Sequence, residues 1–233
     1  MPEAGETPAR SAAQMIVAVL HILDKLLGFG RSAREGVSVL GDGTPVPMMS
    51  YSIVEYLMSL DLRDMDILEA GGGQSTLFWA ARARSVVTLE HDPRWMPDIA
   101  ALTNITLVPV AQDAFPQAIR AQPGPFDLIV LDCAASRYDC AIASIGRLRA
   151  GGAILLDNSD WYPNTTAWLR AQDLIQVDFA DFRPLHRVRA VSSLFLHRDF
   201  RPVPLAEVLP PIPIGGIDRA SRNGWDGPGV SAP

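Results

Sequence analysis

The chain has 233 residues, of which 48% are hydrophobic, and a formal net charge of -6 at neutral pH. A chain of this length and composition is expected to fold as one domain with a sizeable buried core. The acidic balance provides no basic surface for nucleic acid, so we expect a small, neutral or modestly polar ligand instead.

The features that report on location predict a cytoplasmic protein with no membrane partner. The apolar run from Met15 to Leu23 is too short to cross a bilayer and is followed by Asp24 and Lys25. It lacks the basic start and the small-residue cleavage site of a secretory signal. The two cysteines, Cys133 and Cys140, are too few for a disulfide framework, which fits a reducing compartment.

Residues 1–50 are expected to form an extension outside the main domain. From Ser11 to Leu27 the pattern is that of an amphipathic helix, which Gly28 stops. Between Gly28 and Met49, glycine, proline and polar residues predict a loop with at most a short strand. The helix would cover the active site, pair with a second subunit or pack on the core, and packing within or between subunits is the simplest choice.

Strands and helices alternate over residues 51–200, which are expected to form the main domain. A helix from Ser52 to Leu60 is followed by a first strand that ends at Glu69. The further predicted strands are Val86 to Glu90, Ile105 to Val110, Asp127 to Asp132 and Ala153 to Asp157. The predicted helices between them are Ser75 to Ala83, Arg94 to Ala101, Ala114 to Ala121 and Asp139 to Leu148. This alternation predicts an α/β, doubly wound parallel sheet with helices on both faces.

The end of this domain departs from the alternation. A helix from Thr165 to Gln172 precedes strands near Leu174 to Phe179 and Val191 to Leu196. The link from Asp181 to Ala190 is too short for a crossover helix, which predicts antiparallel pairing at the edge of a seven-stranded, Rossmann-like sheet. Residues 201–233 are dense in proline and glycine and predict an extended or disordered tail. This tail and the N-terminal helix are the candidate contacts of a homodimer.

A glycine turn follows the first strand. Glycines let the backbone approach a ligand closely, and the first amides of the next helix are free to bind it or to be capped by Ser75 or Thr76. The second strand ends in Glu90, 21 positions after Glu69. In doubly wound sheets such an acid accepts hydrogen bonds from ribose hydroxyls, although a solvated strand-end charge is the plainer alternative. The pair predicts a nucleoside-binding crevice.

Four motifs in a fixed order carry a resemblance to a known family. They are Glu-Ala-Gly-Gly-Gly-Gln-Ser-Thr at 69–76, Val-Thr-Leu-Glu-His-Asp-Pro at 87–93, Phe-Asp-Leu-Ile-Val-Leu-Asp at 126–132, and Leu148 to Asp160. Over roughly Tyr51 to Phe200 the chain resembles class I S-adenosylmethionine-dependent methyltransferases, in particular small bacterial sugar or polysaccharide and catechol-type O-methyltransferases. Ser75 stands at the third glycine of the usual pattern, and this departure argues against an NAD-binding fold.

The resemblance implies S-adenosylmethionine as cofactor and assigns residues to it. Glu69 is expected to hold the amino-acid moiety, directly or through water, while Gly71 and Gly73 let the cofactor's backbone pass. Asp113 is expected at the adenine amine or, equally, as a helix cap. Tyr51 is expected to border the cofactor and His91 to stack near its adenine, and packing is the alternative for both. The complete expected set is Tyr51, Glu69, Gly71, Gly73, Ser75, Thr76, Glu90, His91, Asp113 and Asp132.

Asp132, Asp157 and Asn158 follow two neighbouring predicted strands. Three oxygen donors at this edge suit Mg²⁺ or another divalent cation, and the same trio marks the metal site in the resembling enzymes. Such a cation would lower the pKa of an acceptor hydroxyl. The alternative is that the two acids cap loops and bond backbone amides.

The general base is open, because the lysine of catechol-type enzymes is missing after Asp132. Asp160, in a loop over the site, is the leading candidate, with His91 and His186 behind it. Arg137, Trp161 and Tyr162 are a candidate sugar platform or, alternatively, packing residues.

The sequence therefore predicts an S-adenosylmethionine-dependent O-methyltransferase that acts on a hydroxyl of a sugar or small molecule with a divalent cation. Asp160 and Asp132 are its expected catalytic residues. Metal-free methyl transfer to a different acceptor is the first alternative. A methyltransferase-like protein that holds the cofactor or its product without catalysis is the second.

Overall fold

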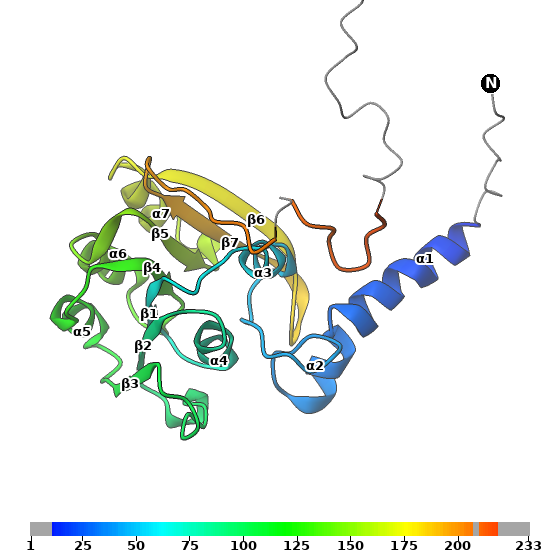
Figure 1. Ribbon diagram of the computed structural model, residues 1–233, viewed down its shortest axis with the longest axis horizontal. Helices are drawn as coiled ribbons and strands as arrows, with labels where there is room; N and C mark the ends of the chain where they lie inside the picture. The colour runs from blue at the N-terminus through cyan, green and yellow to red at the C-terminus, as the bar shows by residue number, and fades with distance from the viewer. Residues whose placement is uncertain (1–10, 207–209, 219–233) are drawn as a thin grey trace, which may run out of the picture.

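A computed structural model describes residues 11–206 and 210–218 of the chain, and it contains a seven-stranded sheet (Figure 1). The strands are β1 Asp66–Ala70, β2 Ser85–Glu90, β3 Ile105–Pro109, β4 Phe126–Leu131, β5 Leu148–Asp157, β6 Ile175–Arg183 and β7 His186–Leu196. Their order is β3-β2-β1-β4-β5-β7-β6, and β7 alone runs against its neighbours. The predicted Rossmann-like sheet with an antiparallel last strand is confirmed.

The strand order places the ligand crevice. The chain moves outward from β1 to β2 and β3, and then returns to the other side of β1 for β4 and β5. In such sheets ligands bind beyond the carboxyl ends of the strands, at the point where the order reverses. The crevice is therefore expected between the ends of β1, β2 and β4.

Helices cover both faces of the sheet (Figure 1). The helices of the main domain are α3 Tyr51–Met58, α4 Gln74–Ala80, α5 Phe115–Ala121, α6 Arg137–Ile145 and α7 Pro163–Arg170. Neighbouring strand residues point to opposite faces, so that Ile67 packs in one hydrophobic core with α3 and α4. Leu68 packs in the other core with α5, α6 and α7. The unbroken apolar strands thus serve two cores, as burial on both faces requires.

The predicted helix from Arg94 to Ala101 is wrong. Only a 3₁₀ turn, Pro93–Trp95, forms there, and the chain after it is irregular. Pro97 lacks a backbone N–H and disrupts a helix interior, which explains why the pattern misled.

The structure also contains a short helix that the sequence analysis missed, α2 Phe29–Glu35. Gly28 and Gly36, both with left-handed backbone angles, bound it. Buried Ser32 anchors it, because its hydroxyl donates to the carbonyl of Val39 and accepts from the Val39 amide. A long-range anchor of this kind leaves no periodic signal in the sequence.

The hairpin of β6 and β7 is longer than predicted. The charged segment 181–190, expected as a link, belongs mostly to the two strands and turns only at Pro184 and Leu185. Arg187 and Arg189 of this segment are exposed, whereas Arg183 is buried.

Helix α1 Ala12–His21 and the π-helical turn Ile22–Leu26 project away from the sheet (Figure 1). No residue of either segment is buried, so packing of this helix on the core of the same chain is not observed. Its apolar side chains that are more than half exposed are Met15, Ile16, Val17, Val19 and Leu20. Pairing with a second subunit stays a prediction.

None of the described helices is by itself both long and apolar enough to span a membrane. The bent pair Ala12–Leu26 and Phe29–Glu35, which meet at 45°, reaches the length and composition of a span only when the two are counted together.

The first part of the predicted tail is extended and packs on the domain. The amide of Asp61 donates to Val203, the amide of Leu205 donates to Ser59, and further along the amide of Ile214 donates to the carboxylate of Glu55. Segments 207–209 and 219–233 of the tail lie outside the described residues.

Candidate functional site

The glycine turn between β1 and α4 packs tightly against the end of β4. Gly71 has a φ of 97°, and a Cβ at this position would lie 2.6 Å from the carbonyl of Asp132. Only glycine accommodates both the left-handed angle and this approach. The turn is therefore held directly beside the first residue after β4.

A pocket of about 660 Å³ opens at this point, and we call it the glycine pocket. The glycine turn, Glu90 and Asp132 line it at the ends of β1, β2 and β4. Distant segments complete the lining: residues 36–38 and 48 of the N-terminal extension, residues 94–97, and Leu185 of the hairpin. These residues were not predicted from the sequence, because they reach the pocket from distant parts of the chain and carry no local motif.

Glu90 stands at the centre of this arrangement and is 3% exposed. Its Oε1 accepts hydrogen bonds from the amides of His91 and Asp92, both at 2.7 Å. Its Oε2 accepts one from the amide of Gly72 at 2.6 Å. A carboxylate has about four acceptor positions, so one position on Oε2 stays available at the pocket.

Glu69 is turned away from the pocket. Its carboxylate is fully buried and accepts hydrogen bonds from the Thr76 hydroxyl at 2.5 Å, the Thr88 hydroxyl at 2.8 Å and the Trp79 indole at 2.9 Å. Burial raises the pKa of Glu69 to about 7, against the hydrogen bonds that favour its ionised form. Through these contacts Glu69 connects β1, β2 and α4. They give no support to the expected direct contact of Glu69 or Thr76 with a cofactor.

The other expected cofactor residues divide into two groups. Ser75 and His91 line the glycine pocket, and the His91 ring makes an edge-to-face contact with Phe115. Tyr51 is completely buried, with its hydroxyl unpartnered among the described residues, and burial raises its pKa. Asp113 is exposed and lies outside the lining of the pocket. The pocket thus gathers most, but not all, of the expected set.

The acids expected to bind a metal are neutralised by arginines instead. Arg137, 5% exposed, donates from Nη2 to Asp132 Oδ1 at 2.9 Å and from Nη1 to the carbonyl of Asp157 at 2.8 Å. Its remaining bonds go to the carbonyls of Leu131 and Cys133. A guanidinium therefore lies between the two strand ends, in the place where the sequence analysis expected a cation.

Asp157 is compensated in the same way. Ser192 donates to its Oδ1 at 2.6 Å, and Arg183 Nη1 lies 3.6 Å from its Oδ2. Burial and the nearby charge of Asp132 raise the pKa of Asp157, which disfavours the ionised form that a metal ligand requires.

The residues present therefore do not fit a divalent cation, and the predicted site at Asp132, Asp157 and Asn158 is not supported. Across the described segments, no group of three or more His, Cys, Asp or Glu side chains is arranged to hold a metal ion. From the sequence, Arg137 was predicted only as part of a sugar platform or as a packing residue, because the direction of its side chain is decided by the fold.

Asp160 is exposed on the 3₁₀ turn Ser159–Trp161 and does not line the glycine pocket. Asp132 does, with its side chain 26% exposed. Of the two predicted catalytic carboxylates, Asp132 is the one that faces the pocket, and the role of Asp160 stays a prediction.

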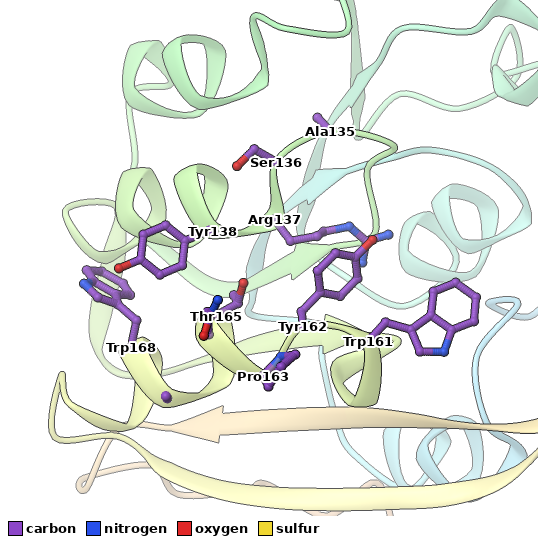
Figure 2. Close-up of a pocket in the computed structure, with 11 residues that line it drawn as sticks. Ala135, Ser136, Arg137, Tyr138, Trp161, Tyr162, Pro163, Thr165 and Trp168 are labelled. Atoms are coloured by element: carbon purple, nitrogen blue, oxygen red, sulfur yellow. The ribbon is translucent and has the colours of Figure 1, made fainter.

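The candidate sugar platform lies in a second cavity. Arg137, Trp161 and Tyr162 line a groove of about 690 Å³ between the start of α6 and the start of α7 (Figure 2). The Arg137 guanidinium stacks on the Tyr162 ring at 5.1 Å. We call this cavity the aromatic groove.

Comparisons with known proteins show the fold. No protein-family model matches the chain, and no curated protein does. The solved Precorrin-6y C5,15-methyltransferase of Geobacter metallireducens GS-15 is similar with a TM-score of 0.54 and 14% identity, over 69% of this chain and 97% of that one. A candidate caffeoyl-CoA O-methyltransferase from Staphylococcus aureus gives 0.53 and 13%, over 80% of this chain and 100% of that one. The chain therefore has the fold of class I methyltransferases.

Proposed function

We propose that the protein is an S-adenosylmethionine-dependent methyltransferase that methylates a hydroxyl of a small molecule without a divalent cation. One observation carries this proposal: the glycine turn, Glu90 and Asp132 line the same pocket at the ends of β1, β2 and β4. In this fold that position is where a nucleotide-like ligand binds.

The lining fits the cofactor in three respects. Glu90 keeps an acceptor position for a ribose hydroxyl. Ser38, which is 3% exposed, lines the pocket, and its buried hydroxyl has no hydrogen-bond partner among the described residues. Trp95 lies over the glycine turn, 3.6 Å from the point that a Cβ of Gly73 would occupy, and its ring can cover a bound nucleoside. When bound, S-adenosylmethionine supplies a methyl group on a positively charged sulfur.

We assign Asp132 as the base that takes the proton from the acceptor hydroxyl. Methylation of a hydroxyl releases one proton, and Asp132 is the predicted carboxylate that faces the pocket. Burial raises its pKa, while the Arg137 guanidinium acts in the opposite direction and holds the carboxylate in place. Arg137 and Arg183 also balance the charge of the two acids, so no cation is required for that purpose.

Calorimetric titration with S-adenosylmethionine tests the cofactor assignment. Glu90→Gln removes the charge of the ribose acceptor, and a hydrogen bond to a charged group contributes about 1.5–3 kcal/mol, so affinity should fall about tenfold or more. Glu35→Gln, a change in an exposed pair with Arg31, is the matched control and should leave the affinity unchanged. Equal affinities of the two variants would refute the ribose role of Glu90, and absence of binding by the unaltered protein would refute the proposal.

Release of S-adenosylhomocysteine, measured with a panel of hydroxylated acceptors, tests the reaction. Asp132→Asn should lower turnover strongly while cofactor affinity is retained, and a chelator should have no effect. Binding without turnover by the unaltered protein would favour the alternative of a non-catalytic cofactor-binding protein. Loss of turnover with a chelator would instead show that a divalent cation is needed and would refute the metal-free reaction.

A further inference from the structure

The aromatic groove is lined by four aromatic side chains from two segments that meet only in the fold (Figure 2). Tyr138 lies in α6 and Trp168 in α7, and their rings form an edge-to-face wall at one end, with centroids 6.2 Å apart. Tyr162 and Trp161 lie at the other end, and Trp161 is 61% exposed. Aromatic rings that stay exposed along a groove offer flat apolar faces to a ligand.

The groove is electrically neutral apart from one residue. That residue is Arg137, and four of its five N–H groups donate to Asp132 and to the carbonyls of Leu131, Cys133 and Asp157. A phosphate or carboxylate would therefore have to compete with Asp132 for the single cation in the lining. The chemistry disfavours an anionic or nucleotide ligand and favours a neutral one.

Small polar groups lie between the aromatic rings. Thr165 is 2% exposed and lies in the middle of the groove, where its hydroxyl is a small polar group. Asn164 adds an exposed amide, and the Ser136 hydroxyl, which accepts from the amide of Asp139, can still donate. Aromatic faces with donors and acceptors between them match a ring that has apolar C–H faces and a rim of hydroxyls.

The groove begins where the glycine pocket ends. Asp132 and Ala134 line the glycine pocket, whereas Ala135, Ser136 and Arg137 of the same loop line the aromatic groove. The two cavities therefore adjoin each other at this loop. The volume of about 690 Å³ is within the range of small-molecule sites.

We propose that the aromatic groove binds a neutral carbohydrate, and that this carbohydrate is the acceptor of the methyltransferase. The second half of this statement rests on the proposed function, whereas binding of the carbohydrate does not. A planar phenolic acceptor is the competing occupant, but it would leave the Thr165 hydroxyl and the Asn164 amide with few groups to bond.

Saturation-transfer NMR and fluorescence titration with neutral tetrasaccharides of glucose, mannose and galactose test this site directly. At least one should bind, and Trp161→Ala should weaken it about three- to tenfold through loss of ring contact. Trp161→Phe, which keeps an apolar ring, should recover part of that loss. Because Trp161 is largely exposed, the substitution should leave the fold intact, which thermal unfolding checks.

The matched control is Trp95→Ala, which removes a half-exposed indole from the glycine pocket instead. This variant should weaken S-adenosylmethionine and spare the tetrasaccharide, whereas Trp161→Ala should do the reverse. Failure of all three sugars to bind, tighter binding of catechol in the groove, or equal sugar affinity of both variants would overturn the carbohydrate site. Absence of cofactor binding, with sugar binding intact, would overturn the methyltransferase proposal and the acceptor role, and would leave the carbohydrate site standing.

Discussion

A methyl group at Gly71 tests how tightly the glycine turn is built into the sheet. The Cβ of Gly71→Ala would lie 2.6 Å from the carbonyl carbon and oxygen of Asp132 and 2.7 Å from the amide nitrogen of Cys133. These are backbone atoms, so no change of rotamer relieves the contact. The φ of 97° adds strain, because left-handed backbone angles cost an L-residue about 1–2 kcal/mol.

The two costs act together in this variant. Overpacking of a tight site costs about 1–3 kcal/mol, so Gly71→Ala should lower the free energy of unfolding by about 2–5 kcal/mol. Gly36→Ala isolates the backbone term, because Gly36 has a φ of 70° and open space around its Cβ position, and it should cost about 1–2 kcal/mol. Gly146→Ala has neither problem, with a φ of -72° and open space, and should be neutral or stabilising by up to about 1 kcal/mol.

Urea unfolding followed by far-ultraviolet circular dichroism measures all three variants on one scale. The expected order of stability is Gly146→Ala, then Gly36→Ala, then Gly71→Ala. A loss at Gly71 no larger than the loss at Gly36 would refute the close approach of the glycine turn to β4.

Two further predictions concern the buried charges. Arg137→Met removes the partner of Asp132 and of three carbonyls, and breaking a buried pair costs about 3–5 kcal/mol, so urea unfolding should show a loss of that size. Arg63→Met, in an exposed pair with Asp61, should show no measurable loss. Burial raises the pKa of Glu69 from 4.5 to about 7, an interval worth about 3 kcal/mol. This contribution to stability is complete below about pH 4.5 and is lost as the pH rises through 7. The free energy of unfolding of the protein relative to that of Glu69→Gln should therefore decrease between these two pH values. A difference that stays constant with pH would contradict the raised pKa of Glu69.

Most of the fold and the central part of the site could be predicted from local patterns in the sequence. The strands were readable because burial on both faces requires unbroken apolar runs, as in Ile67-Leu68 and Ile129-Val130-Leu131. The glycine turn and Glu90 were readable because spacing along the chain places them at neighbouring strand ends. Each of these features depends on residues close together in the chain, which is why composition and spacing were sufficient.

Other features depended on which groups meet across the sheet, and only the tertiary structure decided them. Asp132 and Asp157 have the spacing of a metal site, yet Arg137 from the first turn of α6 pairs with the carboxylate of Asp132, and Arg183 from β6 pairs with that of Asp157. Glu69 lies at the position expected of a cofactor ligand, yet its carboxylate is buried and accepts hydrogen bonds from Trp79 and Thr88. The physical reason is the same in both cases: the role of a carboxylate depends on the donors nearest to it, and those donors are side chains of other elements whose directions are set by the fold.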